Sequence, residues 1–401
     1  MTDPQTRLAT RKDVTVGLLL TLTLLGVFPI DVVLPSFPAL SEHFQSPSSD
    51  IALSVSLFAV GIAFSQLLIG PLSDVMGRKN LLLIGIAISA VGATGCVLVD
   101  SYWSFLFFRV IQALGCGCFV LSQALIQDLF TGQEQQRLRI LLVTCGGIFI
   151  SFSPLAGTGL QSWMGWRGSF LVFTALSIGV FASACRLLEH SRGDVHPRRF
   201  NFVASYRKVL GDFSFLAYWL ISALAFSCHF SFIVISPLIL IDQLHLSPEA
   251  FSLVLLGYGL AYIGGGLIAT MLSNRIDPQT QIMTGLGLIL AAGLLMLGLA
   301  NQLGLSVTTL LLPMIVCTAG TTIARAAANN QAMTLFPGQA GTSASAGSVL
   351  VFIVGGLTSA VISLLPLDLQ VALALCLVLL SLLGLTLNAL VRQRDGGLLP
   401  G

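Results

Sequence analysis

The sequence has little charge. Of its 401 residues only 9% are Asp, Glu, Lys or Arg, whereas 55% are apolar. A globular domain in water keeps about a quarter of its residues charged, and no segment here is polar enough to form a soluble body. We therefore expect a protein embedded in a lipid bilayer. Lys and Arg number 19 against 17 for Asp and Glu, so no strong field of one sign is present to recruit nucleic acid.

Clustered metal ligands and catalytic groups are also missing. The eight cysteines all lie in apolar runs, without the spacing of a metal site or a disulfide framework. Cys116 and Cys118 are two residues apart, which places them on different faces of a helix. We expect no metal and no cofactor. The apolar runs hold no paired carboxylates and no Ser/His pair, which argues against an intramembrane enzyme. A sensor would carry a soluble output domain, for which the chain has no segment.

Long apolar runs fill the chain instead. About 20 apolar residues cross a bilayer as a helix, and twelve such spans fit the sequence. They are predicted at 15–37, 50–71, 79–99, 103–128, 138–161, 167–188, 213–240, 249–272, 280–300, 305–334, 342–365 and 368–391. An even number of spans places both termini on the same side. The fold class predicted is an all-α integral membrane protein.

Basic residues predict the orientation and the division of the chain. With the N-terminus in the cytoplasm, the cytoplasmic loops hold nearly all Lys and Arg, and only Arg167 lies on the opposite side. The longest polar stretch, 189–212, separates six spans from six. We expect an N-terminal six-helix bundle over 1–188, a cytoplasmic linker over 189–212 and a C-terminal six-helix bundle over 213–401. A similarity between 70–79 and 266–275, at matching places in the two halves, is typical of transporter repeats.

Ionisable residues inside a bilayer are costly, so each one is a candidate for function. Asp31 in the first span and Arg109 in the fourth are each about 9 Å below the outer face, at about 1.5 Å per helical residue. They could pair, directly or through water. A buried carboxyl group that gains or loses an arginine neighbour would exchange a proton, which a proton-coupled carrier needs. The alternative is a static ion pair that fixes the helix register.

Other polar residues predict a substrate cavity. Gln112 lies close to one turn from Arg109 and could share its polar face. Arg325 is followed by Asn329 and Asn330, and this polar run must face the bundle interior or a wet cavity. It could contact an acidic substrate, or it could form hydrogen bonds between bundles. His229 lies among aromatic residues of the seventh span, which could line a ligand cavity or simply pack.

Two further segments are candidates for conformational roles. Segment 70–79 is predicted as a loop between the second and third spans, where Gly70 and Gly77 allow a sharp turn. Asp74 and Arg78 could form a charge network there, as a latch between states. The alternative is a solvated turn. In the fifth span, Gly147, Pro154 and Gly157 predict a closely packed helix that bends, which is a candidate gate.

Several segments resemble those of a known family. Segment 70–79 resembles the signature between the second and third helices of the major facilitator superfamily, and 109–115 resembles the arginine motif of its fourth helix. Segment 31–38 is similar to the acidic first-helix motif of its twelve-span drug:proton antiporters. Segments 165–170, 236–237, 246–248 and 340–346 resemble the bicyclomycin and chloramphenicol resistance (Bcr/CflA) branch. Ser153 stands before Pro154 where the antiporter motif usually has glycine.

The resemblance implies a major facilitator fold and proton-driven export of small molecules, drugs or a secreted metabolite from the bacterial cytoplasm. Asp31 and Arg109 would couple transport to protons. We expect a multi-pass protein of the inner membrane with both termini in the cytoplasm, acting as a monomer. Two alternatives stay open: an exporter dedicated to an anionic metabolite such as a carboxylate siderophore, and a proton-coupled uptake symporter.

Overall fold

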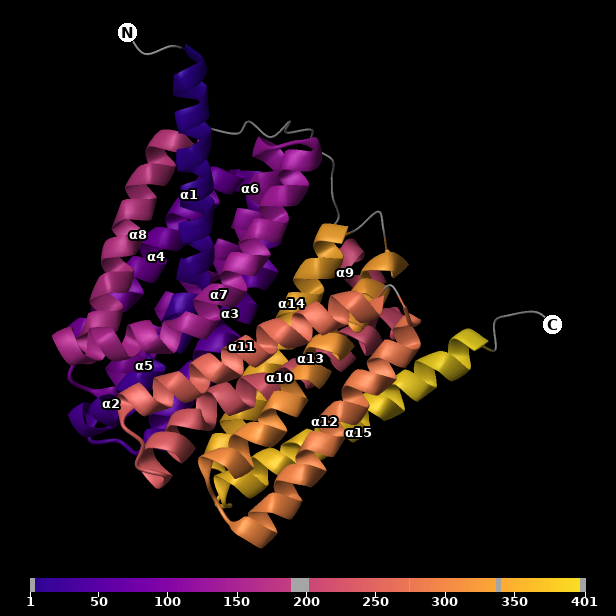
Figure 1. The fold of residues 1–401 in the computed structure, drawn as a ribbon. Coiled ribbons are helices and arrows are strands. Elements are labelled where there is room, and N and C mark those ends of the chain that lie inside the picture. Colours follow the sequence, from indigo (N-terminus) through magenta and orange to yellow (C-terminus); the bar gives the residue numbers. More distant parts are fainter. Residues whose placement is uncertain (1–3, 189–201, 274, 337–339, 397–401) are drawn as a thin grey trace. The chain divides into compact units, whose positions relative to one another are not determined.

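The structure is a computed structural model that describes residues 4–188, 202–273, 275–336 and 340–396. These residues form helices and short connections, without a β-strand (Figure 1). The helices are α1 (Pro4–Asp31), η1 (Leu34–Ser36), α2 (Phe37–Phe44), α3 (Ser48–Met76), α4 (Arg78–Leu98), α5 (Tyr102–Cys116), η2 (Gly117–Val120), α6 (Leu121–Leu129), α7 (Gly132–Met164), α8 (Arg167–Leu187), α9 (Phe202–Leu210), α10 (Phe213–Pro237), η3 (Leu238–Gln243), α11 (Pro248–Ser273), α12 (Pro278–Leu303), α13 (Val307–Leu335), α14 (Ala340–Leu364) and α15 (Leu369–Gly396).

The helices match the predicted spans. Within the described part of the chain, 11 helical segments are long and apolar enough to cross a membrane, and each coincides with one predicted span. The remaining prediction, 138–161, lies inside α7, a continuous helix of 33 residues. At about 1.5 Å per residue this helix also exceeds the ~30 Å of a hydrocarbon core. The all-helical membrane fold predicted from the sequence is confirmed.

The first span is not the single helix that its apolar run predicts. Helix α1 ends at Asp31, and the chain continues through a turn, the short 3-10 helix η1 and then α2. Prolines cause this interruption, because Pro35 and Pro38 have no amide hydrogen and disfavour helical geometry in the preceding residue. The amide of Ser36 donates to the carbonyl of Val33 in a tighter turn. The fourth span is interrupted similarly, since α5 ends at Cys116 and the 3-10 helix η2 leads into α6.

The predicted loop over 70–79 was wrong in extent. Helix α3 continues to Met76, and α4 begins at Arg78, so that Gly77 alone makes the turn. Its φ of 80° lies in the left-handed region, which glycine adopts without strain. Hydropathy locates only the apolar part of a helix, and α3 extends past that part into polar sequence. The turn is therefore much sharper than a ten-residue loop.

The chain forms two compact units, which are described separately. The first comprises residues 1–45 and 64–198, and the second residues 46–63 and 199–401. In the first unit α4 packs against α5 and α8, and α1 against α7 and α8. In the second, α10 is buried along almost its whole length by α13, α14 and α15. The first half of α3 joins this unit through α14, where the hydroxyls of Ser56 and Ser359 are 2.8 Å apart.

The predicted boundaries at 188 and 212 stay a prediction. Residues 189–201, the first half of the predicted linker, lie outside the described residues. The second half contains a helix, α9, which packs on α10 and α14. Tyr206 and Val209 of α9 are buried, and the Tyr206 hydroxyl donates to Ser345 Oγ at 2.9 Å. Burial raises the pKa of this tyrosine. This part of the linker is therefore an ordered element of the second unit.

Glycine residues allow α4 and α5 of the first unit to make backbone contact. Because Gly92 of α4 has no side chain, the backbone of α5 approaches it at Gln112, where an added Cβ would lie 2.6 Å from the Cα of Gln112. Gly85 and Gly115 allow the same contact further along the two helices, since a Cβ on Gly115 would lie 2.7 Å from the Cα of Ser89. Small residues permit such backbone contact where no hydrophobic effect drives helix association.

We expect Gly92→Ala to lower the free energy of unfolding by about 1–3 kcal/mol, the usual cost of forcing extra atoms into a packed core. The matched control is Gly179→Ala in α8, where a Cβ meets nothing within 4 Å. Both changes replace a helical glycine by a better helix former. Thermal unfolding of the purified proteins in detergent should show a lower midpoint for Gly92→Ala alone. Equal midpoints for the two variants would contradict the packing described here.

Candidate functional site

Asp31 lies at the end of α1, where the first span is interrupted. Its side chain is 7% exposed, and among the described residues it has neither a hydrogen-bond donor nor an ion-pair partner. Because α1 stops here, the following carbonyl groups lack the partners of a continued helix. The carbonyl of Val32 accepts a hydrogen bond from Ser169 Oγ of α8 at 3.4 Å. An acidic side chain and freed backbone groups thus lie together in the first unit.

Helix α7 also contacts the segment that interrupts the first span. Ser36 Oγ of η1 donates to Gln161 Oε1 at 2.6 Å. One turn earlier on α7, Gly157 touches the chain directly, since a Cβ there would overlap the carbonyl oxygen of Val32 and come within 3.2 Å of Pro35. Gly157, predicted as part of a gate, therefore contacts the segment that follows Asp31. Pro154 lies within the same helix, as predicted. Gly147 accepts a hydrogen bond from Ser151 Oγ at 3.0 Å through its carbonyl.

Arg109 is completely buried in α5. Its Nη1 donates to Gln112 Oε1 at 2.9 Å, so the two residues share a polar face as their spacing indicates. The guanidinium also lies 5.7 Å from the ring centre of Phe170 in α8, a cation–π distance. Among the described residues no ion pair joins Arg109 to Asp31. The pairing that the sequence allows is therefore not formed in this conformation, and neither is the static ion pair of the alternative interpretation.

His229 of α10 belongs to an aromatic cluster in the second unit. Its Nδ1 is 2.6 Å from the hydroxyl of Tyr258, and its ring stacks on Tyr258 and lies 4.8 Å from the ring of Tyr262. Tyr258 and Tyr262 are one turn apart on α11. Neither tyrosine was predicted from the sequence as a site residue, although their spacing of four places them on one helix face. A buried tyrosine usually has a hydrogen-bond partner, so this spacing could have indicated a polar contact from the sequence.

Arg325 of α13 adjoins the same cluster. Its Nη1 donates to the Tyr262 hydroxyl at 3.2 Å, and its guanidinium lies 4.7 Å from the ring centre of Phe226. Asn329 follows one turn later, and its Oδ1 is buried without a hydrogen-bond partner. Asn330 is exposed and points away from this face by helix geometry. The structure therefore brings together His229 and Arg325, with Asn329 beside them and Asn330 apart.

The turn at Gly77 is connected to two neighbouring helices. Arg78 Nη1 donates to the carbonyl of Ala124 in α6. Lys79 is buried, and its Nζ donates to the carbonyl of Cys185 at 3.1 Å and to that of Leu188. Lys79 therefore caps the C-terminus of α8, where a cation also complements the helix dipole. Gly70, predicted to allow the turn, instead lies within helix α3, and the side chain of Asp74 lies outside the part that the structure describes.

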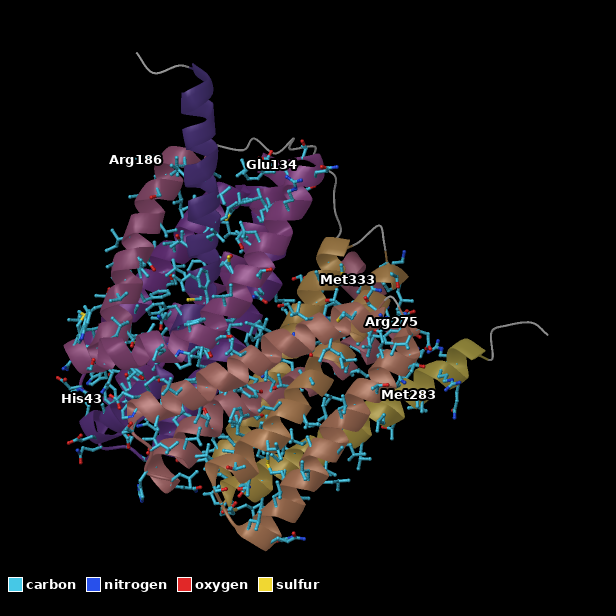
Figure 2. All side chains as sticks on the ribbon, viewed as in Figure 1. His43, Glu134, Arg186, Arg275, Met283 and Met333 are labelled. Carbon is cyan, nitrogen blue, oxygen red and sulfur yellow. The ribbon has the colours of Figure 1, made fainter. Side chains whose placement is uncertain are left out.

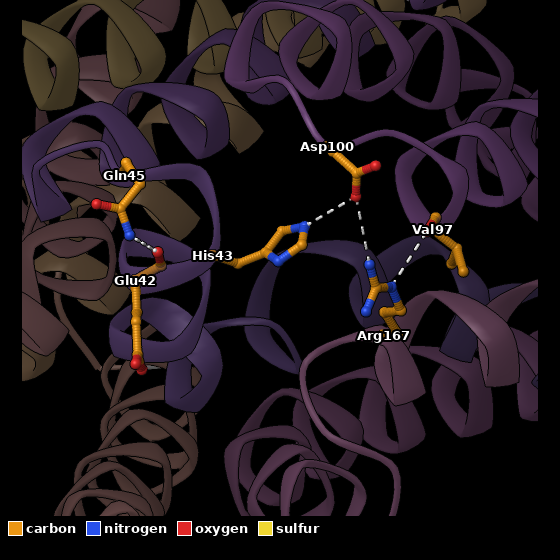
Figure 3. Close-up of polar contacts among 6 residues, drawn as sticks. All are labelled: Glu42, His43, Gln45, Val97, Asp100 and Arg167. Atoms are coloured by element: carbon orange, nitrogen blue, oxygen red, sulfur yellow. Dashed lines mark hydrogen bonds and ion pairs between the residues drawn. The ribbon is translucent and has the colours of Figure 1, made fainter.

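The opposite end of the first unit has its own polar contacts. Asp100 Oδ1 lies 3.7 Å from Arg167 Nη2, an ion pair, and 3.5 Å from His43 Nε2 (Figure 3). Arg167 Nε also donates to the carbonyl of Val97 at 3.2 Å. In Figure 2 His43 marks this end, whereas Arg186 and Glu134 mark the other. Because Asp100 is 85% exposed, these ion pairs contribute little to stability. They bring together α2, the connection between α4 and α5, and the start of α8 at one end of the unit.

Apolar helices of spanning length, with a few ionisable side chains buried among them, define a multi-pass membrane transporter. Such residues inside spans mark substrate and ion pathways. The chain belongs to the Major Facilitator Superfamily, whose sequence model matches residues 19–360. Members of this family are transporters of small molecules and not enzymes, and the bacterial relatives below indicate a protein of the bacterial inner membrane.

Relatives and solved structures agree with this assignment. The chain is 28% identical over 360 residues to a chloramphenicol resistance protein of Pseudomonas aeruginosa, covering 88% of this chain and 84% of that protein. It is 23% identical over 333 residues to the multidrug resistance protein MdtL of Klebsiella pneumoniae (strain 342), covering 82% and 83%. The fold is similar to the crystal structure of a D-xylose-proton symporter, with a TM-score of 0.72, 17% identity and coverage of 92% and 96%.

The cap on α8 gives a testable prediction. Lys79→Met should lower the free energy of unfolding by about 1–2 kcal/mol, because it leaves the last carbonyls of α8 without their donor. Arg186→Met is the matched control, since it removes the same charge from the last turn of α8, where the Arg186 side chain is exposed. Denaturation in mild detergent measures both. A loss in Arg186→Met as large as in Lys79→Met would mean that charge alone, and not the cap, matters.

Proposed function

We propose that this protein is a proton-coupled exporter that moves small molecules, drugs among them, from the cytoplasm across the inner membrane. One observation carries the proposal: Asp31 is buried at a helix interruption without a hydrogen-bond or ion-pair partner among the described residues. A static structural carboxylate would be expected to have such partners, because burying an unpaired charge is costly. A carboxyl group that binds a proton in one state and releases it in another is expected to lack permanent partners.

Arg109 is the second residue in the proposed proton exchange at Asp31. Its charge is permanent, because a guanidinium keeps its proton under all ordinary conditions. In the present conformation Gln112 and Phe170 hold it. If a movement of α5 relative to α1 brings Arg109 close to Asp31, the ionised carboxylate becomes favourable and the proton leaves. When the two separate, Asp31 takes up a proton again. Substrate and proton would alternate through this change of distance.

The interruption after Asp31 is the proposed moving joint. A continuous helix resists bending, whereas a turn and a 3-10 segment change with little loss of hydrogen bonding. Gly157 and Gln161 of α7 contact this joint directly. A bend of α7 near Pro154 would therefore move the segment next to Asp31. We propose that this contact couples the gate predicted in the fifth span to the proton site.

The direction of transport rests on the relatives. The proteins named for chloramphenicol and multidrug resistance support export, because resistance requires that a drug leave the cell. The D-xylose-proton symporter shares the fold alone and carries no argument for uptake. The distribution of Lys and Arg supports cytoplasmic termini. We also propose that the protein acts as a monomer, since one chain contains the proton site and the aromatic cluster.

Asp31→Asn should abolish proton-driven transport, because the amide keeps the size of the side chain but cannot carry the proton. In inverted membrane vesicles with an acidic lumen, the unchanged protein should accumulate radiolabelled chloramphenicol. The variant should accumulate it only to the level of vesicles without the transporter. Asp100→Asn is the matched control, since Asp100 is an exposed carboxylate of the same unit, and its uptake should stay unchanged.

Two results would contradict the proposal. Gradient-driven accumulation at the normal rate in Asp31→Asn would remove Asp31 from the mechanism. Accumulation that requires an alkaline lumen, with protons and substrate moving in the same direction, would instead establish symport.

Gly157→Ala tests the proposed joint. The added methyl group would overlap the carbonyl of Val32 and push α7 away from the segment after Asp31. We expect the initial rate of accumulation to fall roughly tenfold, since a displacement of about 1 Å in reacting groups costs up to about 100-fold. Gly159→Ala is two residues away on α7, where a Cβ meets nothing within 4 Å, and should transport normally. Equal rates in both variants would show that this contact does not affect coupling.

A further inference from the structure

The aromatic cluster of the second unit has a charge that its surroundings do not balance. Arg325 lies within the membrane-spanning helix α13. Its described contacts are a neutral hydroxyl, that of Tyr262, and an aromatic ring, that of Phe226. No carboxylate among the described residues forms an ion pair with it. A permanent cation placed in this way is costly unless an anion compensates it during function.

Arg325 also has unused hydrogen-bonding capacity. Its Nε is buried and has no hydrogen-bond partner. One turn along the same face of α13, the Oδ1 of Asn329 is an acceptor that is buried without a partner. Buried polar groups of proteins are almost always hydrogen-bonded, so a donor and an acceptor that both lack partners one helix turn apart need an explanation. Both would be satisfied by a ligand that carries an anionic acceptor next to a donor group.

The surroundings of Arg325 favour a ligand that contains a ring. Phe226 stacks on Phe230 at 5.4 Å and meets Phe352 edge-on at 5.7 Å. On the other side, Tyr262 lies against His229. These rings give the guanidinium an apolar aromatic border, which suits the flat face of a cyclic ligand. Phe226, Tyr262 and Arg325 are each only half-buried, so parts of these side chains are accessible in this conformation.

We propose that Arg325, bordered by Phe226 and Tyr262, binds the carboxylate of an aromatic organic acid, and that the transported substrates include this class. The inference rests on the proposed transport function and specifies its substrates. A guanidinium suits the role, because its planar donors match the two oxygens of a carboxylate. Tyr262 holds Nη1 and so orients the group, while the buried Nε has no partner among the described residues and would bind the ligand after a movement of the side chain. The amide of Asn329 would accept from a hydroxyl on the ring.

The test compares two ligands that differ mainly in charge. Salicylate is an aromatic carboxylate with a neighbouring hydroxyl, and salicylamide is its neutral analogue of nearly the same shape. Calorimetric titration of the full-length protein in lipid nanodiscs should show tighter binding of salicylate. Arg325→Met should weaken salicylate binding about tenfold or more, the loss expected for charge-assisted hydrogen bonds. Salicylamide binding should change by much less.

Further variants keep the test decisive. Arg275→Met removes an exposed arginine of the same unit and should leave salicylate binding unchanged. Arg325→Lys keeps the charge but loses the planar pair of donors, so binding should fall to an intermediate level even if Arg325→Met does not fold. The proposal is overturned if the unchanged protein fails to prefer salicylate. Equal losses of both ligands in the Arg325 variants, or no loss, would also overturn it.

The proposal of proton-coupled export and the proposal of an anion site can be contradicted independently. The titration contains no proton gradient, so its result does not depend on coupling through Asp31. The vesicle assay uses chloramphenicol, which carries no carboxylate, so a failure there leaves the anion site untouched.

Discussion

The cost of placing a charged or unpaired polar group in hydrocarbon governs this structure. Few ionisable groups occur within the spans, and they differ in the residues that contact them. Arg109 is completely buried, with its guanidinium directed at Gln112 and Phe170. Arg325 has only a hydroxyl and a ring as its described partners. Asp31 has none among the described residues. The absence, within the described part of the chain, of a partner at Asp31 and of a carboxylate at Arg325 is the basis for the roles proposed for them.

Backbone contact determines where these groups lie. Gly92 allows α4 to touch α5 at Gln112, which fixes the polar face that includes Arg109. Gly157 allows α7 to touch the chain just beyond Asp31. In both places a side chain as small as a methyl group would separate the helices. The polar residues are thus positioned by residues without side chains, and the first unit holds its candidate proton site through packing more than through ion pairs.

Helix interruptions free backbone groups inside the first unit. Prolines break the first span after Asp31, and a 3-10 turn interrupts the fourth span beyond Arg109. A break frees carbonyl groups, and neighbouring side chains then satisfy them, as Ser169 does for Val32. Lys79 serves the end of α8 in the same way. In the second unit, His229 of α10 and Arg325 of α13 instead adjoin a cluster of aromatic rings on α10 and α11.

The sequence by itself determined the spans, the scarcity of charge within them and the presence of Asp31, Arg109 and Arg325 inside spans, because hydropathy and charge are properties of each segment alone. The hydrogen bond between Arg109 and Gln112 was also predictable, since both lie on one helix turn. Only the tertiary structure decided that Asp31 and Arg109 stand unpaired with each other, that Tyr262 holds Arg325, and that Gln161 meets Ser36. These contacts join residues far apart in the chain. Their geometry depends on how helices pack, which no local pattern of residues specifies.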